Sequence, residues 1–401
     1  MTELTGRIEG KSAITEKNHI LITTILVWCG LVVVSSLYVT IPLISIFSSA
    51  FGATPSEASW TISAFSFAYA VGFLLFASLS EKYGRKQMML AGLIALSVVS
   101  PILGIVNSLS LIVILRAVQG LAASTFAPAV LAYVVEMFPI EKRITTIGFV
   151  STGFLMAGIV GQVLSSLLSQ NLGWSSVFYF LGGFYLLSAI LLAGFVPKGD
   201  VQNKKINVFV PFKQMGTLLF KKTLFFCYFI TITLLLSFVG MYTALGDYLS
   251  QHPFGLNSNQ ILMVRATGII GMMFSPFAGR LVSKFGMKKV LQGGLLLATM
   301  GIAFIGVSSY LPLLTFMTVI FVAGISIAVP TLISLIGNLG GESRGIAVSL
   351  YTFILFIGAT LGPIVSSNLL KTGNYVLTFE VLAALLCIGF FSSFFVGIKE
   401  K

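Results

Sequence analysis

The feature that most constrains this chain is the recurrence of twelve apolar stretches, each about 20 residues or longer, along its whole length. As a helix, a stretch of that length spans the hydrocarbon core of a bilayer, which is about 30 Å thick. Only helices and closed barrels satisfy all their backbone hydrogen bonds inside lipid. The period-2 alternation typical of barrel strands is absent here. The sequence therefore predicts an all-α polytopic membrane protein.

Composition agrees with that prediction. Hydrophobic residues make up 57% and charged residues 9% of the 401 residues, and the mean hydropathy is +1.01. No soluble core of this size could bury so much apolar surface. The predicted spans are residues 20–48, 56–80, 87–107, 109–136, 143–168, 175–196, 223–249, 258–283, 289–308, 311–337, 345–368 and 375–397.

Two similar segments, residues 77–86 and 279–288, lie 202 positions apart and indicate a duplicated unit. Leu79, Lys82, Gly84 and Lys86 recur in the second segment at the same offset. Each segment is a short polar turn between two apolar stretches, so the two halves are expected to share one fold. The predicted organisation is a cytoplasmic tail at 1–19, a six-helix bundle at 20–196, a central cytoplasmic loop at 197–222, a second six-helix bundle at 223–397 and a cytoplasmic C-terminus at 398–401.

The distribution of cations predicts the orientation, because Lys and Arg next to membrane spans stay on the cytoplasmic side. If the N-terminus is cytoplasmic, 21 of the 24 Lys and Arg residues lie in cytoplasmic segments. Lys371 alone would lie outside, and Arg116 and Arg265 fall within spans. Both termini are therefore predicted to be cytoplasmic. The net charge of +12 then reflects topology and contact with anionic lipid, and no nucleic-acid partner is predicted.

The turn Glu81-Lys82-Tyr83-Gly84-Arg85-Lys86, together with Arg116, Gln119 and Gly120 in the fourth span and the small residues of the fifth, resembles the major facilitator superfamily. The resemblance covers the whole chain and is greatest to bacterial twelve-helix drug and metabolite proton antiporters. Ala77 and Glu81 replace the family's first Gly and its Asp, and Gly158 and Gln162 replace the Pro and final Gly of its antiporter motif. The resemblance implies two pseudo-symmetric six-helix bundles that alternate in access about a central cavity.

Glu81, Arg85 and Glu136, with Gly84 and Lys86, are predicted to form a cytoplasmic latch that holds the outward-facing state. At the 202-residue offset, the three charged residues become Ser283, Met287 and Asn338, so all three charges are lost together. Joint loss is expected of groups that neutralise one another at a membrane boundary. The alternative is that these are independent surface charges lost by drift.

Four residues are candidates for the proton or substrate pathway: Arg116, Gln119, Arg265 and Glu380. Arg116 is placed about 10 Å into the fourth span, where an Arg is expected to face water or a partner. The resemblance implies a role for it in proton movement or substrate contact. The alternative for Arg116 and Arg265 is that the side chain extends to the headgroups. Glu380 is a candidate proton carrier or a member of a structural ion pair, and the first span contains no acidic residue.

The resemblance places the cavity between the first, fourth, seventh and tenth spans, with help from neighbouring ones. The candidate cavity residues are Tyr38, Phe65, Tyr69, Phe126, Gln162, Phe238 and Tyr242. Because polar groups are sparse among them, a lipophilic substrate is favoured over a sugar. The candidate gating glycines are Gly153, Gly158, Gly161, Gly358 and Gly362. Small residues let helices approach closely, and ordinary helix packing is the alternative for each of them.

We predict a secondary active transporter that exports small lipophilic or amphipathic compounds in exchange for protons, as a monomer in a bacterial cytoplasmic membrane. The alternatives are a dedicated metabolite exporter, or an uptake carrier for a sugar, amino acid or nucleoside. An enzyme is not favoured, because the sequence has two histidines, no HExxH motif and no paired carboxylates within one span. No catalytic residue, metal or cofactor is predicted. The expected partners are a small-molecule substrate and membrane lipid.

Overall fold

The computed structural model describes residues 16–199 and 209–397, and these residues form helices without any strand. The first bundle contains α1 (Glu16–Ser35), α2 (Ile44–Phe51), α3 (Pro55–Tyr83), α4 (Arg85–Ile105), α5 (Leu109–Ser124), α6 (Ala127–Met137), α7 (Ile140–Leu172) and α8 (Trp174–Phe195). After α9 (Phe209–Phe220), the second contains α10 (Lys222–Ser250), α11 (Ser258–Met272), η2 (Ser275–Phe277), α12 (Ala278–Phe285), α13 (Met287–Val307), α14 (Leu311–Leu339), η3 (Gly341–Ser343), α15 (Arg344–Leu370), α16 (Tyr375–Ser392) and η4 (Ser393–Phe395).

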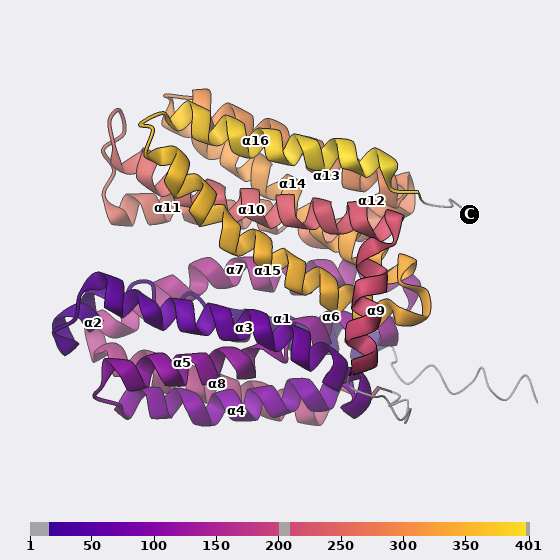
Figure 1. Cartoon of the computed structure of the whole chain (residues 1–401), viewed down its shortest axis with the longest axis horizontal. Coiled ribbons are helices and arrows are strands. Elements are labelled where there is room, and N and C mark those ends of the chain that lie inside the picture. The colour runs from indigo at the N-terminus through magenta and orange to yellow at the C-terminus, as the bar shows by residue number, and fades with distance from the viewer. Residues whose placement is uncertain (1–15, 200–208, 398–401) are drawn as a thin grey trace, which may run out of the picture.

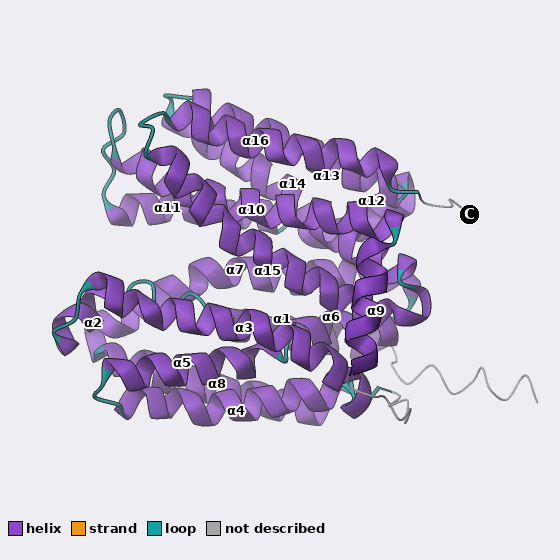
Figure 2. Ribbon diagram, viewed as in Figure 1, coloured by secondary structure: helices purple, strands orange, loops and turns teal. Residues whose placement is uncertain are grey.

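The helices form two layers of similar build (Figure 1). In the first bundle α1 packs on α7, α3 on α5 and α4 on α8, and in the second α10 packs on α15, and α13 on α14 and α16. Within the described residues, eleven helical segments are long and apolar enough to cross a membrane. Helix α3, of 29 residues, takes the place of the second predicted span. The predicted all-α membrane fold is confirmed, and its helices are consistent with two bundles of six spans. Loops are short and lie mainly at the two ends of the bundles (Figure 2).

Three predicted spans are not continuous helices. Turns at residues 36–43, which include Pro42, separate α1 from α2. Pro128 lies in the first turn of α6, just after the break that follows α5, and Pro276 lies in η2 between α11 and α12. A proline removes one backbone donor and clashes with the preceding turn, which favours a break at these places. Pro330, the counterpart of Pro128, lies inside the unbroken helix α14.

The duplicated turns adopt the same conformation in the two bundles. Gly84 joins α3 to α4 with φ 95° and ψ 143°, and Gly286 joins α12 to α13 with φ 81° and ψ 156°. Positive φ favours glycine, so each turn depends on it. Two residues later, Lys86 donates to the carbonyl oxygen of Ala193 at 2.8 Å, and Lys288 donates to that of Phe394 at 3.1 Å. The repeat in the sequence is thus a repeat in the structure.

The predicted central loop at 197–222 is partly helical. Helix α9 contacts α10 and α15 of the second bundle and α3 of the first, and it buries Met215 and Leu218. Residues 200–208 of that predicted loop lie outside the described residues, as do most of the predicted tail at 1–19 and the C-terminus at 398–401. Figure 1 shows α9 standing across both layers, at the end that also carries the α3–α4 and α12–α13 turns. We call this the basic end, because most of the described cations lie there.

Candidate substrate cavity and conformational contacts

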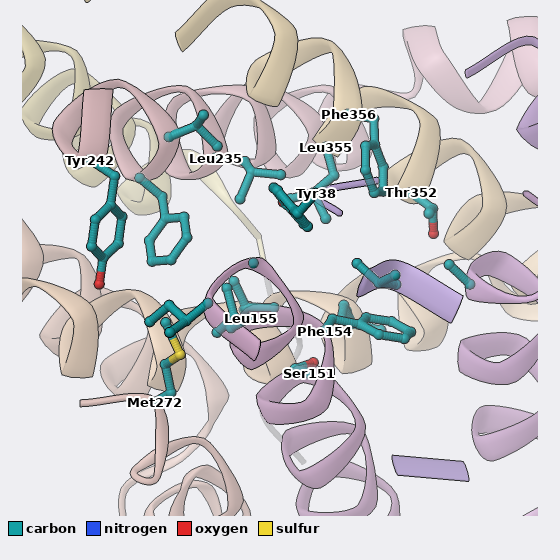
Figure 3. A pocket seen from close by; sticks show the side chains of 18 of the residues that line it. Tyr38, Ser151, Phe154, Leu155, Leu235, Tyr242, Met272, Thr352, Leu355 and Phe356 are labelled. Atoms are coloured by element: carbon teal, nitrogen blue, oxygen red, sulfur yellow. The ribbon is translucent and has the colours of Figure 1, made fainter. Parts of the chain in front are cut away.

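An apolar cavity lies between the two bundles and is built from both of them. In Figure 3, side chains of α7 face those of α10 and α15 across it. The lining residues are Val34, Tyr38, Ala127, Leu131, Ser151, Phe154, Leu155, Gly158, Ile159, Gln162, Leu235, Phe238, Val239, Tyr242, Leu262, Arg265, Met272, Val329, Ile333, Tyr351, Thr352, Leu355 and Phe356. Aliphatic and aromatic side chains dominate this wall. A substrate held here would therefore be mainly apolar.

Some polar atoms of the cavity wall lack a hydrogen-bond partner within the described part of the chain. They are the hydroxyls of Ser151, Tyr242 and Tyr351 and the Nε atom of Arg265. The Gln162 amide, in contrast, donates to the Gly158 carbonyl oxygen at 2.6 Å. Buried polar groups are rarely left unsatisfied in folded proteins. The unpartnered atoms are therefore available to a bound molecule or to water.

Four of the seven residues predicted to line the cavity do so, namely Tyr38, Gln162, Phe238 and Tyr242. Phe65, Tyr69 and Phe126 do not line it and are buried in helix packing. Tyr69 contacts the Phe356 ring of the second bundle, with 4.9 Å between ring centroids. The difference arises because an aromatic residue in an apolar helix gives no sequence signal for the face on which it lies.

Arg116 is fully buried, and all three of its nitrogen atoms donate hydrogen bonds inside the first bundle. Nε donates to the Thr61 carbonyl oxygen at 3.0 Å, Nη1 to the Ser36 carbonyl oxygen at 2.9 Å, and Nη2 to Thr40 Oγ1 at 3.2 Å. Ser36 and Thr40 lie in the break between α1 and α2, where backbone groups are released from the helical ladder. Arg116 thus secures the broken first span to α3 and α5.

Phe65 and Gln119 also contact the Arg116 guanidinium group. The guanidinium carbon of Arg116 lies 4.2 Å from the centroid of the Phe65 ring, a cation–π distance. Gln119 accepts from Arg116 Nη1 at 2.6 Å and donates to Ser100 Oγ of α4 at 2.7 Å. Arg116 and Gln119 were predicted to lie on the proton or substrate pathway, but neither lines the cavity. Their hydrogen-bonding capacity is directed at the protein itself.

The other two candidates for the proton or substrate pathway are Arg265 and Glu380, and only Arg265 lines the cavity. Among the residues that the structure describes, Arg265, in α11, is the one that lines the cavity and carries a formal charge. Glu380 lies exposed on α16, outside the cavity lining, because α16 packs on α13 and α10 through its other face. The structure therefore does not place Glu380 on a pathway through the cavity.

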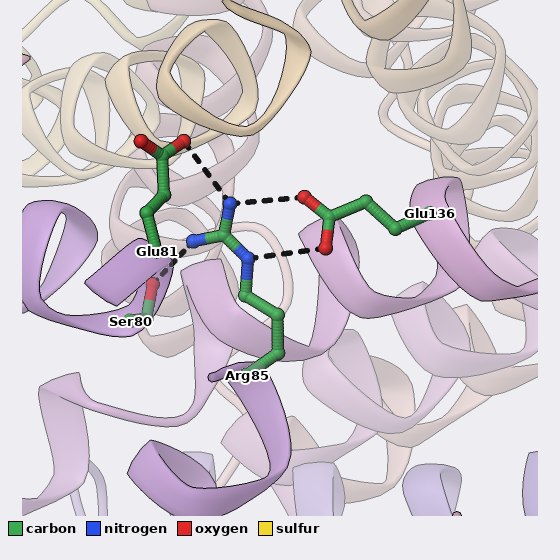
Figure 4. A network of polar contacts seen from close by, with 4 residues as sticks. All are labelled: Ser80, Glu81, Arg85 and Glu136. Carbon is green, nitrogen blue, oxygen red and sulfur yellow. Dashed lines mark hydrogen bonds and ion pairs between the residues drawn. The ribbon is translucent and has the colours of Figure 1, made fainter. Parts of the chain in front are cut away.

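An ionic cluster at the basic end joins α3, α4 and α6 (Figure 4). Arg85 Nη2 lies 3.1 Å from Glu81 Oε1 and 3.0 Å from Glu136 Oε1, and Arg85 Nε donates to Glu136 Oε2 at 3.3 Å. Arg85 also donates to Ser80 Oγ. Its side chain is only 6% exposed, so solvent screening of these ion pairs is weak. The sequence-predicted pairing of Arg85 with both carboxylates is present, while Lys86 points instead to α8.

The second bundle preserves this contact without charge. Asn338 Nδ2 lies 3.7 Å from Met287 Sδ, and these two residues are the counterparts of Glu136 and Arg85. The same pair of positions is thus in contact in both halves. The counterparts of Arg85 and Glu136 are therefore neighbours in the second bundle although neither is charged.

The ionic cluster is internal to the first bundle, but it abuts the second. A Cβ atom on Gly345, near the start of α15, would collide with Arg85 Nη2 and approach Glu81 Oε1 to 2.8 Å. Close contacts between bundles continue nearby, where Val135 meets Gly337 and Thr152 Oγ1 donates to the Met272 carbonyl oxygen at 3.1 Å. These contacts lie toward the basic end, where the two bundles are packed together.

Four of the five predicted gating glycines lie at helix contacts within one bundle and not at the contact between the two bundles. Gly153 and Gly161 pack α7 against α1, and Gly358 and Gly362 pack α15 against α10. Both of these contacts are inside a single bundle. Gly158 faces Tyr38 of the cavity. A small residue signals close helix approach but does not identify the neighbouring helix, so the sequence could not distinguish packing within a bundle from packing between bundles.

Gly148 of α7 is a glycine at which the two bundles do meet. A Cβ atom there would clash with the backbone of Ser275 and lie 2.9 Å from Pro276 Cα. Gly148→Val is expected to lower transport at least about tenfold, because the basic end could no longer close, while Gly148→Ala gives an intermediate rate. Transport by purified protein in liposomes measures both effects. Gly183→Val in α8, where no atom lies within 4 Å of the added Cβ, is the control and should keep the wild-type rate.

These features define a class of protein: a helical membrane transporter, with two similar bundles that enclose a central cavity and close against each other at one end. A profile of the Major Facilitator Superfamily matches residues 26–363 and, separately, residues 225–400. The chain therefore belongs to the Major Facilitator Superfamily.

The chain is also similar to several individual transporters. An uncharacterized transporter of Buchnera aphidicola (subspecies Acyrthosiphon pisum) is 27% identical over 83% of this chain and 81% of its own. Multidrug resistance protein 1 of Bacillus subtilis is 26% identical over 77% and 79%, and the multi-drug resistance efflux pump PmrA of Streptococcus pneumoniae is 25% identical over 89% and 90%. The crystal structure of the human organic anion transporter MFSD10 matches in fold with a TM-score of 0.75 and 15% identity, over 93% of this chain and 99% of that one.

Proposed function

We propose that this transporter exports small lipophilic compounds across the bacterial cytoplasmic membrane by alternating access, in exchange for protons. The observation that carries the proposal is the apolar cavity between bundles that pack together at the basic end. With the basic end cytoplasmic, as the cation distribution predicts, this arrangement is the outward-facing state. The multidrug resistance proteins among the relatives add support for efflux.

In this proposal the Arg85 cluster is the latch of the outward-facing state. Glu81 places a carboxylate beside the first turn of α15, the positive end of a helix in the other bundle. Arg85 holds Glu81 and Glu136 in place from within the first bundle. Opening of the basic end would separate Glu81 from α15 and leave the intrabundle ion pairs intact. The latch would therefore be a contact between an ordered ionic cluster and a helix terminus.

Proton coupling is tested with liposomes that contain the purified protein and have an acidic lumen. An antiporter would move a lipophilic fluorescent probe into the lumen as protons leave, and accumulation is expected to exceed that of empty liposomes about tenfold or more. Collapse of the pH gradient with nigericin should remove the difference. Accumulation that survives nigericin would exclude proton coupling.

A parallel panel of sugars, amino acids and nucleosides addresses the alternative of a solute carrier. The sparse polar lining of the cavity predicts that none of these solutes accumulates. Uptake of one of them, with no movement of any lipophilic probe, would replace the export proposal with a dedicated carrier.

A further inference from the structure

We propose that Arg265 is the recognition group for an anionic moiety, and that the transported compounds are lipophilic organic anions. This inference rests on the proposed transport function and names its substrate class. It starts from the cavity wall, where, among the described residues, a single cation lies among aliphatic and aromatic side chains and no acidic residue contributes to the lining.

Arg265 has no ionic partner in the described part of the chain. Both salt bridges found there belong to Arg85. Nη2 of Arg265 donates to the carbonyl oxygen of Tyr242 at 2.8 Å, which occupies one of its five N–H donors, and Nε has no partner. An uncompensated cation in an apolar environment is costly, so a ligand that supplies a negative charge gains more here than on a solvated surface.

The surroundings of Arg265 provide space for its guanidinium group and a second donor beside it. Gly246 of α10 leaves the room that Arg265 Nη2 occupies, since a Cβ atom there would collide with it. Gly268 of α11 does the same for the Tyr242 hydroxyl, which is buried and unpartnered. A guanidinium and a phenol can together bind the oxygen atoms of a carboxylate or sulfonate. The remaining wall, with Phe154, Phe238 and Phe356, suits an apolar body.

Comparison with Arg116 shows why Arg265 is the group available to a ligand. Each Arg116 nitrogen donates to an oxygen of the first bundle, and the Phe65 ring covers its guanidinium. Arg265 makes one such bond and borders the cavity. A lipophilic cation would meet repulsion from Arg265 with no acid in the lining to offset it, so the same geometry disfavours cations.

The test uses three pyrene probes of matched size that carry a sulfonate, a hydroxyl or a quaternary ammonium group. Binding to the purified full-length protein is measured by fluorescence anisotropy, and transport of the sulfonate in the acidic-lumen liposomes. The wild-type protein is expected to bind the sulfonate probe at least about tenfold more tightly than the ammonium probe, as a charge-assisted hydrogen bond predicts.

Arg265→Gln should reduce the ratio of sulfonate to ammonium affinity about tenfold or more. The affinity for the neutral hydroxyl probe should change less than about twofold. Arg265→Lys should retain most of the preference, since it keeps the charge. Lys371→Gln is the control, because it removes an exposed cation outside the cavity lining and should leave all three affinities unchanged.

The outcomes separate the two proposals. Equal or tighter binding of the ammonium probe by the wild-type protein, or unchanged sulfonate affinity in Arg265→Gln, would overturn the assignment of Arg265 and leave lipophilic export standing. Failure of all three probes to bind would overturn both proposals.

Discussion

Replacing Arg116 with methionine is expected to destabilise the first bundle rather than to impair transport selectively. The substitution removes the donors to the Ser36 carbonyl oxygen and to Gln119 Oε1, and it leaves Phe65 without its cation. Each buried acceptor that loses its donor costs about 1–3 kcal/mol, and the break between α1 and α2 loses the side chain that secures it. We expect a fall in melting temperature on the order of 5–10 °C in detergent, with much aggregated protein on size-exclusion chromatography.

Arg265→Gln serves as the matched control, because it also removes a cation from within a span but breaks only one hydrogen bond to the protein. It should melt within about 2 °C of the wild type. The melting temperature of Arg116→Lys should lie between those of the wild type and Arg116→Met, since an ammonium group cannot reproduce the donors of a planar guanidinium group. A monodisperse Arg116→Met protein with wild-type stability and no transport would contradict the structural role and support the pathway role predicted from the sequence.

The second large effect is expected at Arg85. Arg85→Ala leaves Glu81 and Glu136 as neighbouring carboxylates without their shared cation, beside the start of α15. Repulsion between them and loss of the ordered cluster should weaken closure of the basic end. We expect transport to fall about tenfold to one-hundredfold, because an interaction of roughly 1.5–3 kcal/mol with a charged group is lost, while the protein still inserts into the membrane. Glu136→Gln should have a smaller effect in the same direction.

The second half of the chain supplies the control for this prediction. Glu81→Ser, Arg85→Met and Glu136→Asn combined reproduce the uncharged set found at Ser283, Met287 and Asn338. This triple variant should be thermally more stable than Arg85→Ala, because it leaves no uncompensated charge, but it should not recover transport. Transport at the wild-type rate in Arg85→Ala and Glu136→Gln would remove the latch from the mechanism. Restored transport in the triple variant would reduce the cluster to a self-neutralising structural element.

The role of each arginine illustrates the difference between what a motif predicts and what the fold decides. The sequence supported a pathway role for Arg116 more strongly than for Arg265, because Arg116 belongs to a recognisable motif with Gln119 and Gly120 and Arg265 belongs to none. In the structure the nitrogen atoms of Arg116 donate hydrogen bonds to residues of its own bundle. Arg265 is the charged residue that borders the cavity. The sequence did show that each lies within a span. It could not show which oxygens lie within reach, because those oxygens come from residues as distant as Ser36.

By itself, the sequence determined that the protein is a helical membrane protein and that it contains a repeated turn between two helices. These follow from apolar length and from a repeat at fixed spacing, which are local properties of the chain. Tertiary structure alone decided which faces of those helices meet. Gly148 contacts the other bundle, whereas Gly153, five residues further along the same helix, contacts its own bundle. Phe65 packs on the Arg116 guanidinium group and does not line the cavity. In an entirely apolar helix no polar stripe marks the buried face, so the neighbours of each side chain are set by packing between distant segments.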